Sequence, residues 1–127
     1  MNSKYLLDTH IFIWWMEKNK RLQKNIYDII NNPRNSIFLS VASIWEIVLK
    51  RAKGKLKTTT NIERGLKKFG FVILPIEISH VLETEKLPNY HSDPFDRLII
   101  AQSRIEKLMV ISHDQKIWKY NIDLLKC

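Results

Sequence analysis

Short apolar runs recur along the chain, and their composition predicts buried strands. Most are rich in β-branched or aromatic side chains, and none is longer than four residues. These runs cover residues 5–7, 37–39, 71–74 and 109–111. We expect a fifth short strand at the edge of the sheet within residues 121–125.

The segments between these runs have the period of amphipathic helices. Apolar residues fall on one stripe in residues 21–31, 41–51 and 94–108. Strands that alternate with helices predict parallel βαβ units joined by right-handed crossovers. The expected fold class is therefore α/β, with helices on both faces of a small parallel sheet. No repeat or linker divides residues 1–127, so we expect a single domain.

Composition narrows the class of protein. The chain has 127 residues, of which 45% are hydrophobic, and this content excludes intrinsic disorder. No run approaches the roughly 20 apolar residues that a membrane span requires, and Asp8 and His10 interrupt the stretch that a signal peptide would need. The single cysteine, Cys127, leaves no intramolecular disulfide. We therefore expect a cytoplasmic protein without membrane contact.

The net charge of +8 indicates a polyanionic partner. A phosphate backbone attracts lysine and arginine through the release of counterions, so nucleic acid is the first candidate. Charge that only keeps the protein in solution is the alternative.

Acidic residues follow two of the predicted strands. Asp8 comes directly after the first strand, and Asp114 follows the fourth. Ligands of open α/β sheets bind beyond the carboxyl ends of the strands, which is where both acids are expected. Each of them alone is also explained as the cap of a following helix.

Two further acids lie at helical positions. Asp93 is placed to cap the helix that Pro94 begins. Asp96 falls in the first turn of that helix, which favours an anion, so we expect its carboxyl to have a low pKa. Glu46 has the apolar neighbours Trp45 and Ile47, so it is either buried or a solvated residue at the edge of the stripe.

Convergence of these acids would require a cation. Two carboxylates about 4 Å apart repel by roughly 4 kcal/mol at an effective dielectric near 20. A cluster of Asp8, Glu46, Asp96 and Asp114 therefore persists only with a bound cation or with shared protons. Hard oxygen ligands favour Mg²⁺ or Mn²⁺. Such an ion in a basic protein suggests hydrolysis of phosphodiester bonds.

The order of these motifs matches a known family. The chain carries YLLDTH (5–10), SVASIWEI (40–47), DPFDRLIIAQS (93–103) and VISHD (110–114). In order and spacing these segments resemble the PIN-domain ribonucleases, specifically the VapC-type toxins of bacterial toxin–antitoxin modules. The resemblance covers essentially the whole chain. It implies a three-layer α/β/α fold around a parallel sheet of four to five strands.

The resemblance also implies an activity and partners. The expected function is a Mg²⁺- or Mn²⁺-dependent endoribonuclease, with one or two ions, that cleaves structured cellular RNA such as tRNA or rRNA and leaves a 5′ phosphate. A homodimer and a cognate antitoxin are implied as well. Asp8, Glu46 and Asp96 resemble the first, second and third acids of the family, and Asp114 resembles the more variable fourth. We expect Asp8, Asp96 and Asp114 to hold the metal and Glu46 to ligate it through water or to orient the attacking water.

Residues around the acids match the family less specifically. Thr9 and Ser112 correspond to polar residues that follow the first acid and the fourth strand. Asp93 is expected outside the direct ligands, as a cap or a hydrogen-bond acceptor. No role transfers to His113.

Basic and aromatic residues suggest contact surfaces. Five cations follow the Glu46 helix within eight residues and are candidates for RNA binding, with a solvated helix end as the alternative: Lys50, Arg51, Lys53, Lys55 and Lys57. Trp14 and Trp15 belong either to the core or to an antitoxin or dimer interface. Arg97 is a further interface candidate, and a salt bridge to Asp93 is its alternative.

Other functions remain open at the level of sequence. A Mg²⁺-dependent phosphoryl-transfer domain also has acids at strand ends, but the expected second aspartate or late lysine is missing. A PIN-fold module that binds RNA or antitoxin without catalysis is the rival from another class. The RNA target and the identity of the antitoxin are not specified by the sequence.

Overall fold

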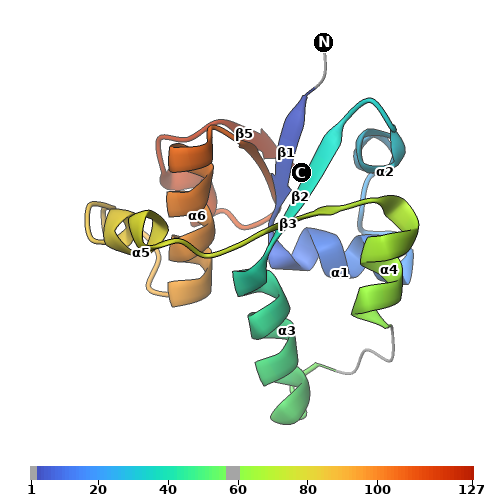
Figure 1. Ribbon diagram of the computed structural model, residues 1–127, viewed down its shortest axis with the longest axis horizontal. Helices are drawn as coiled ribbons and strands as arrows, with labels where there is room; N and C mark the ends of the chain where they lie inside the picture. Colours follow the sequence, from blue (N-terminus) through green and yellow to red (C-terminus); the bar gives the residue numbers. More distant parts are fainter. Residues whose placement is uncertain (1–2, 57–60) are drawn as a thin grey trace.

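A parallel sheet forms the centre of the computed structural model, which describes residues 3–56 and 61–127 (Figure 1). Within these residues five strands pair in the order β3-β2-β1-β4-β5, and each pair is parallel. The strands are β1 (Lys4–Leu7), β2 (Ser36–Ser40), β3 (Val72–Leu74), β4 (Met109–Ser112) and β5 (Leu124–Lys126). The predicted α/β class and the predicted edge strand are confirmed, although β5 begins three residues later than the range expected for it.

Helices connect the strands. They are α1 (Thr9–Glu17), α2 (Lys24–Asn31), α3 (Val41–Ala52), α4 (Ile62–Phe69), α5 (Ile78–Thr84), α6 (Pro94–Glu106) and the short 3₁₀ helix η1 (Ile117–Lys119). The periodicity predicted α2, α3 and α6 within a few residues of their ends. It did not predict α4 and α5, because two turns of helix contain too few apolar positions to establish a period.

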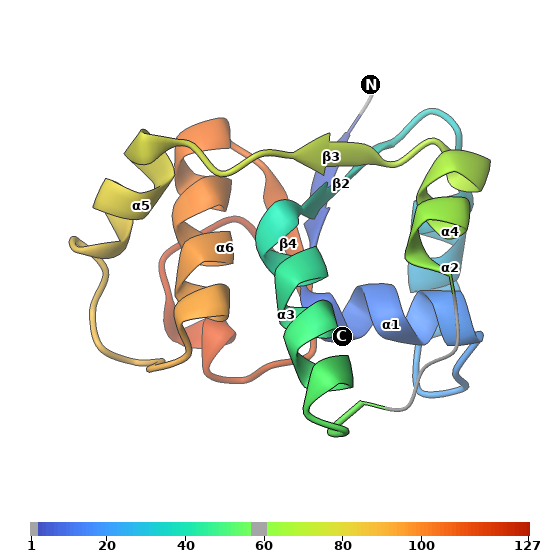
Figure 2. The same cartoon turned by 60° about the horizontal axis from the view of Figure 1, so that its bottom comes forward.

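Both faces of the sheet are covered, which gives the expected three layers. Figures 1 and 2 show α1, α2 and α4 to one side of the sheet and α5 and α6 to the other. Consecutive side chains of a strand point to opposite faces. Accordingly, Leu7 packs in the cluster that contains Phe12 of α1, whereas Leu6 packs in the cluster that contains Ile99 of α6. None of the helices described is long and apolar enough to cross a membrane.

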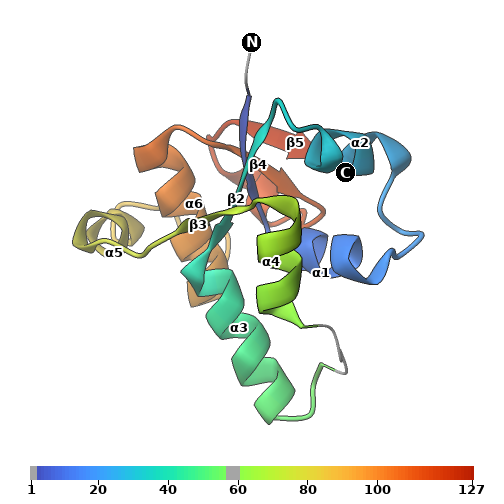
Figure 3. The ribbon, with the colours of Figure 1, turned by 45° about the vertical axis from the view of Figure 1, so that its right-hand side comes forward.

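The sheet places the predicted acids at one edge. β1 lies between β2 and β4, so the carboxyl ends of these three strands are neighbours. Asp8 caps α1 directly after β1, and Ser40 caps α3 directly after β2. In Figure 3, α3 extends away from the sheet at the end of β2. The chain after β4 turns at Asp114, so three connections leave the sheet around one point.

Candidate active site

Asp8 joins the first and fourth strands. Its side chain is only 2% exposed, and Oδ1 accepts the backbone N–H of His10 at 2.7 Å. Oδ2 accepts the hydroxyl of Ser112 at 2.6 Å. Burial raises the pKa of the Asp8 carboxyl above its ordinary value, and the Ser112 hydrogen bond offsets part of that rise. The Ser112 hydroxyl therefore holds the Asp8 carboxylate in place at the end of β1.

Glu46 lies on the buried side of α3, where both of its oxygens have partners. Thr9 donates its hydroxyl to Oε1 at 2.7 Å, and Lys50 lies 2.7 Å from Oε2 one turn further along the helix. Burial alone would lower the pKa of Lys50, but the hydrogen bond and the charge of Glu46 raise it above its ordinary value. Glu46 is only 2% exposed, so the alternative of a solvated Glu46 is wrong.

Asp96 lies in the first turn of α6. The Asp93 side chain caps this helix by accepting the backbone N–H of Phe95 at 2.8 Å, as the sequence predicted. Burial raises the pKa of the Asp96 carboxyl to about 8, and the next causes are the charges of four neighbouring acids, Asp93, Asp8, Glu46 and Asp114. The sequence placed Asp96 in a helix turn that stabilises an anion, so a low pKa was expected. That expectation is wrong because burial and the neighbouring acids outweigh the helix terminus.

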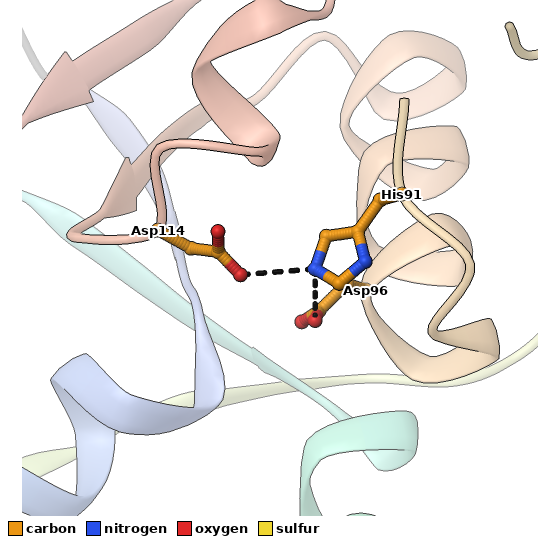
Figure 4. A group of neighbouring side chains, drawn as sticks. All are labelled: His91, Asp96 and Asp114. Atoms are coloured by element: carbon orange, nitrogen blue, oxygen red, sulfur yellow. Dashed lines mark hydrogen bonds and ion pairs between the residues drawn. The ribbon is translucent and has the colours of Figure 1, made fainter. Parts of the chain in front are cut away.

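His91 connects two of the acids (Figure 4). Its Nε2 lies 2.9 Å from an oxygen of Asp96 and 2.9 Å from an oxygen of Asp114. Burial acts to raise the pKa of Asp114, but the hydrogen bond from His91 reverses the effect and lowers it. Ligand atoms of His91, Asp96 and Asp114 all lie within 4.8 Å of one another. Among the described residues, these three form a group whose ligand atoms lie close enough together to hold a metal ion.

The donor set fits a divalent cation. Carboxylate oxygens are ligands for Mg²⁺ and Mn²⁺, and carboxylates that repel one another gain most from a cation between them. The effect of Asp8 and Glu46 on the pKa of Asp96 places both acids near the same point. The assignment of Asp8, Asp96 and Asp114 to an ion stays a prediction.

With this geometry the chain can be compared with known proteins. A family model of the PIN domain matches residues 5–122. The chain belongs to the PIN domain family. No curated protein sequence matches it.

Several solved structures share the fold of this PIN domain. VapBC2 from Rickettsia felis bound to a promoter DNA fragment has a chain of 18% identity with a TM-score of 0.71, over 97% of this chain and 98% of that one. DNA-bound VapBC from Salmonella typhimurium gives 18% identity and a TM-score of 0.67, over 98% of each chain. VapBC-1 from nontypeable Haemophilus influenzae gives 16% identity and a TM-score of 0.65, over 97% of each chain. At these identities the similarity is one of fold.

The predicted RNA-binding cations of the PIN domain point in different directions. Lys50 faces Glu46. Arg51 is half-buried, whereas Lys53 and Lys55 are exposed beyond the end of α3. Lys57 lies outside the described residues. Of this set, Lys53 and Lys55 have the exposure that phosphate contacts require, and RNA binding by the segment stays a prediction.

The predicted interface residues are partly internal. Trp15 is 6% exposed and packs against Phe71 with ring centres 4.8 Å apart. Trp14 is half-buried against His113. Arg97 donates hydrogen bonds to backbone carbonyls at the end of α5 and in the α5–α6 connection, among them that of Thr84 at 2.7 Å. The side chain of Asp93 accepts from the backbone instead of pairing with Arg97. An interface role for these residues stays a prediction.

His91 is the site residue that the sequence analysis missed. It lies in a connection without periodicity, five residues before Asp96, where no strand or helix pattern points to it. The sequence NYHSDPFD does place a histidine just before the predicted cap. Histidine often binds metal ions, so its position just before Asp93 and Asp96 could have pointed to His91 as a site residue.

Without metal, the free energy of unfolding is expected to fall as the pH rises towards 8. Asp96 has a pKa of about 8 in the folded protein and an ordinary value of 3.8. The folded protein therefore retains a proton that the unfolded chain has lost, so the stability present near pH 4 is lost as the pH rises through 8. Between pH 5 and pH 8 the Asp96 contribution is about 3 kcal/mol.

Urea unfolding in EDTA across this range measures the effect. Asp96→Asn should flatten the dependence, whereas the exposed Asp28→Asn should leave it as in wild type. An Asp96→Asn protein with the wild-type slope would show that another group carries the proton.

Replacing Lys50 by methionine should destabilise the metal-free fold by about 1–3 kcal/mol, because a buried carboxylate then lacks its cation. Adding Glu46→Gln removes the orphaned charge and should recover most of this loss. Chemical denaturation of the wild type, both single variants and the double variant gives the coupling energy. Lys55→Met is the exposed control, and additive effects of the two substitutions would contradict the pairing.

Proposed function

We propose that this PIN domain is a metal-dependent endoribonuclease, the toxin component of a toxin–antitoxin module, that hydrolyses structured cellular RNA such as tRNA or rRNA. The observation that carries the proposal is the gathering of acids at one edge of the sheet: ligand atoms of His91, Asp96 and Asp114 lie within 4.8 Å of one another, and the charges of Asp8 and Glu46 act on the same Asp96 carboxyl. Repulsion makes such a cluster of acids energetically costly unless a cation binds between them.

The contacts of each acid suggest its task. Ser112 and the start of α1 fix the Asp8 carboxylate, and His91 holds Asp96 and Asp114 close together. We assign these three acids to the ion. When bound, a divalent ion supplies positive charge to the scissile phosphate and makes a nearby water more acidic. Glu46, held by Lys50, can accept a hydrogen bond from the attacking water.

The surface next to the acids suits a single-stranded segment of a structured RNA. Trp45 precedes Glu46 and is 55% exposed, and its ring meets that of Phe95 edge to face with centres 5.1 Å apart. Exposed aromatic faces stack on bases irrespective of sequence. Lys53 and Lys55 extend from the end of the same helix. Their charge would draw a phosphate backbone towards acids that repel it.

A cavity on the other side of α1 suits an antitoxin segment. It has a volume of about 1070 Å³ and lies between the α1–α2 connection and α4. Apolar side chains such as Trp15, Leu22 and Phe69 line it, together with five cations and no acid: Lys18, Lys20, Lys24, Arg64 and Lys68. An acidic amphipathic helix is the complementary partner. A solved neighbour of 19% identity is itself a toxin–antitoxin complex, from Klebsiella pneumoniae.

A homodimer is also part of the proposal. α5 exposes three large apolar side chains, Ile78, Val81 and Leu82, of which Ile78 is 79% exposed. Contiguous apolar surface of this kind is typical of protein interfaces. We propose that a second copy of the chain covers it.

Purified protein should cleave total cellular RNA to discrete products with Mg²⁺ or Mn²⁺ and not with EDTA. Asp8→Asn should reduce the rate by at least about 100-fold, since it removes a ligand of the ion. Asp28→Asn, an exposed acid on α2, should cleave as wild type does. RNA binding without cleavage by folded, metal-loaded protein would favour the non-catalytic module instead.

Charge reversal in the cavity should weaken binding of an acidic partner. A labelled, Glu-rich amphipathic peptide with leucines on one face is the probe, and fluorescence anisotropy gives its Kd. Lys24→Glu with Lys68→Glu should raise the Kd by about tenfold or more at low salt. Lys53→Glu with Lys55→Glu is the matched control of equal charge. Equal effects of the two pairs would reduce the contact to net charge and remove the cavity from the proposal.

A further inference from the structure

His91 is held at both nitrogens of its ring. Nδ1 accepts the backbone N–H of Asp93 at 3.2 Å, and Nε2 lies 2.9 Å from Oδ2 of Asp96 and from Oδ2 of Asp114. Because Nδ1 acts as an acceptor, the neutral ring carries its hydrogen on Nε2. In this tautomer Nε2 is a hydrogen-bond donor. It has no lone pair to offer a metal ion.

The backbone that carries His91 is fixed independently of the acids. Tyr120 accepts the His91 backbone N–H at 3.0 Å and donates its own hydroxyl to the carbonyl of Pro88 at 2.7 Å. Arg97 donates to the carbonyls of Pro88 and Leu87 at 3.0 and 3.2 Å. These bonds fold the α5–α6 connection onto α6. The imidazole is therefore presented to the acids by a preformed support.

We propose that His91 is a positioning residue of the metal site. Its Nε2–H holds one oxygen of Asp96 and one of Asp114 side by side, so that two carboxylates from separate elements can share one ion. The backbone N–H of Lys116 binds Oδ1 of Asp114 at 2.8 Å and fixes the other end of that carboxylate. The inference rests on the metal site of the proposed function and goes beyond it by assigning the group that assembles the site.

The reason is electrostatic. An ion binds the ionised carboxylates, and ionised carboxylates whose oxygens lie within 4.8 Å repel each other, so without a donor between them they would move apart. Binding would then have to bring them together again at a cost in affinity. Hydrogen bonds that orient metal-binding carboxylates change metal affinity by about 10–100-fold when they are removed.

Two substitutions separate a donor at Nε2 from other roles. The amide nitrogen of glutamine can reach the place of Nε2, whereas that of asparagine reaches only the place of Nδ1. Mn²⁺ affinity is measured calorimetrically for the wild type, His91→Gln and His91→Asn, with Asp28→Asn as the control. We expect His91→Gln to bind within about threefold of wild type and His91→Asn to bind about 10–100-fold more weakly.

Tyr120→Phe provides a test that leaves the imidazole in place. It removes the hydroxyl that holds the backbone of His91, so Mn²⁺ affinity should fall by a few-fold. Circular dichroism in EDTA monitors the fold of every variant. An unchanged Mn²⁺ affinity in folded Tyr120→Phe would contradict the preformed support.

The outcomes distinguish this inference from the proposed function. A wild-type protein that binds no Mn²⁺, or an Asp96→Asn variant that binds as tightly as wild type, would overturn the metal site and the role of His91 together. Wild-type affinity in His91→Asn, with loss in Asp96→Asn, would overturn the role of His91 alone. Equal losses in His91→Gln and His91→Asn would indicate direct ligation through the ring and would also overturn it.

Discussion

Repulsion between carboxylates at the end of the sheet is the constraint on which the site depends. Three of the acids each have a different partner, which lowers the energetic cost of placing a carboxylate there. Ser112 binds Asp8, Lys50 pairs with Glu46, and His91 binds Asp114. Asp96 has the most acids around it and retains its proton up to a pH of about 8. The protein thus holds a cluster of acids whose mutual repulsion a bound divalent ion would offset.

The fold gathers these acids with few residues. Three adjacent parallel strands end at the same edge, and the helices that follow two of them begin with capping side chains, Asp8 and Ser40. Asp8 therefore serves two purposes, because Oδ1 caps α1 while Oδ2 receives Ser112. The prediction of a helix cap is therefore correct for Asp8, and its role as a site residue stays a proposal. At sites of this kind one carboxylate can satisfy the helix and the chemistry together.

The sequence predicted the features that depend on the local pattern of apolar and polar residues. Apolar runs and helical periods predicted the sheet, α3 and α6, and the acids after strands were expected at the edge where they lie. It did not predict His91 or the direction of Lys50, since both depend on which side chains meet across separate elements. A lysine near the end of α3 could contact RNA or bind Glu46 equally well until the burial of Glu46 is known. Arg97 is similar, because its partners include carbonyls of a connection with no pattern of its own.

The most direct test of the account is the number of protons released when Mn²⁺ binds. Titration calorimetry at pH 7 in buffers of different ionisation enthalpy measures both the binding and the release. With a pKa of about 8 for Asp96 in the metal-free protein, one ion should bind and displace about one proton. Binding without proton release, or no binding at all, would contradict the view that the gathered acids form a metal site with a stored proton.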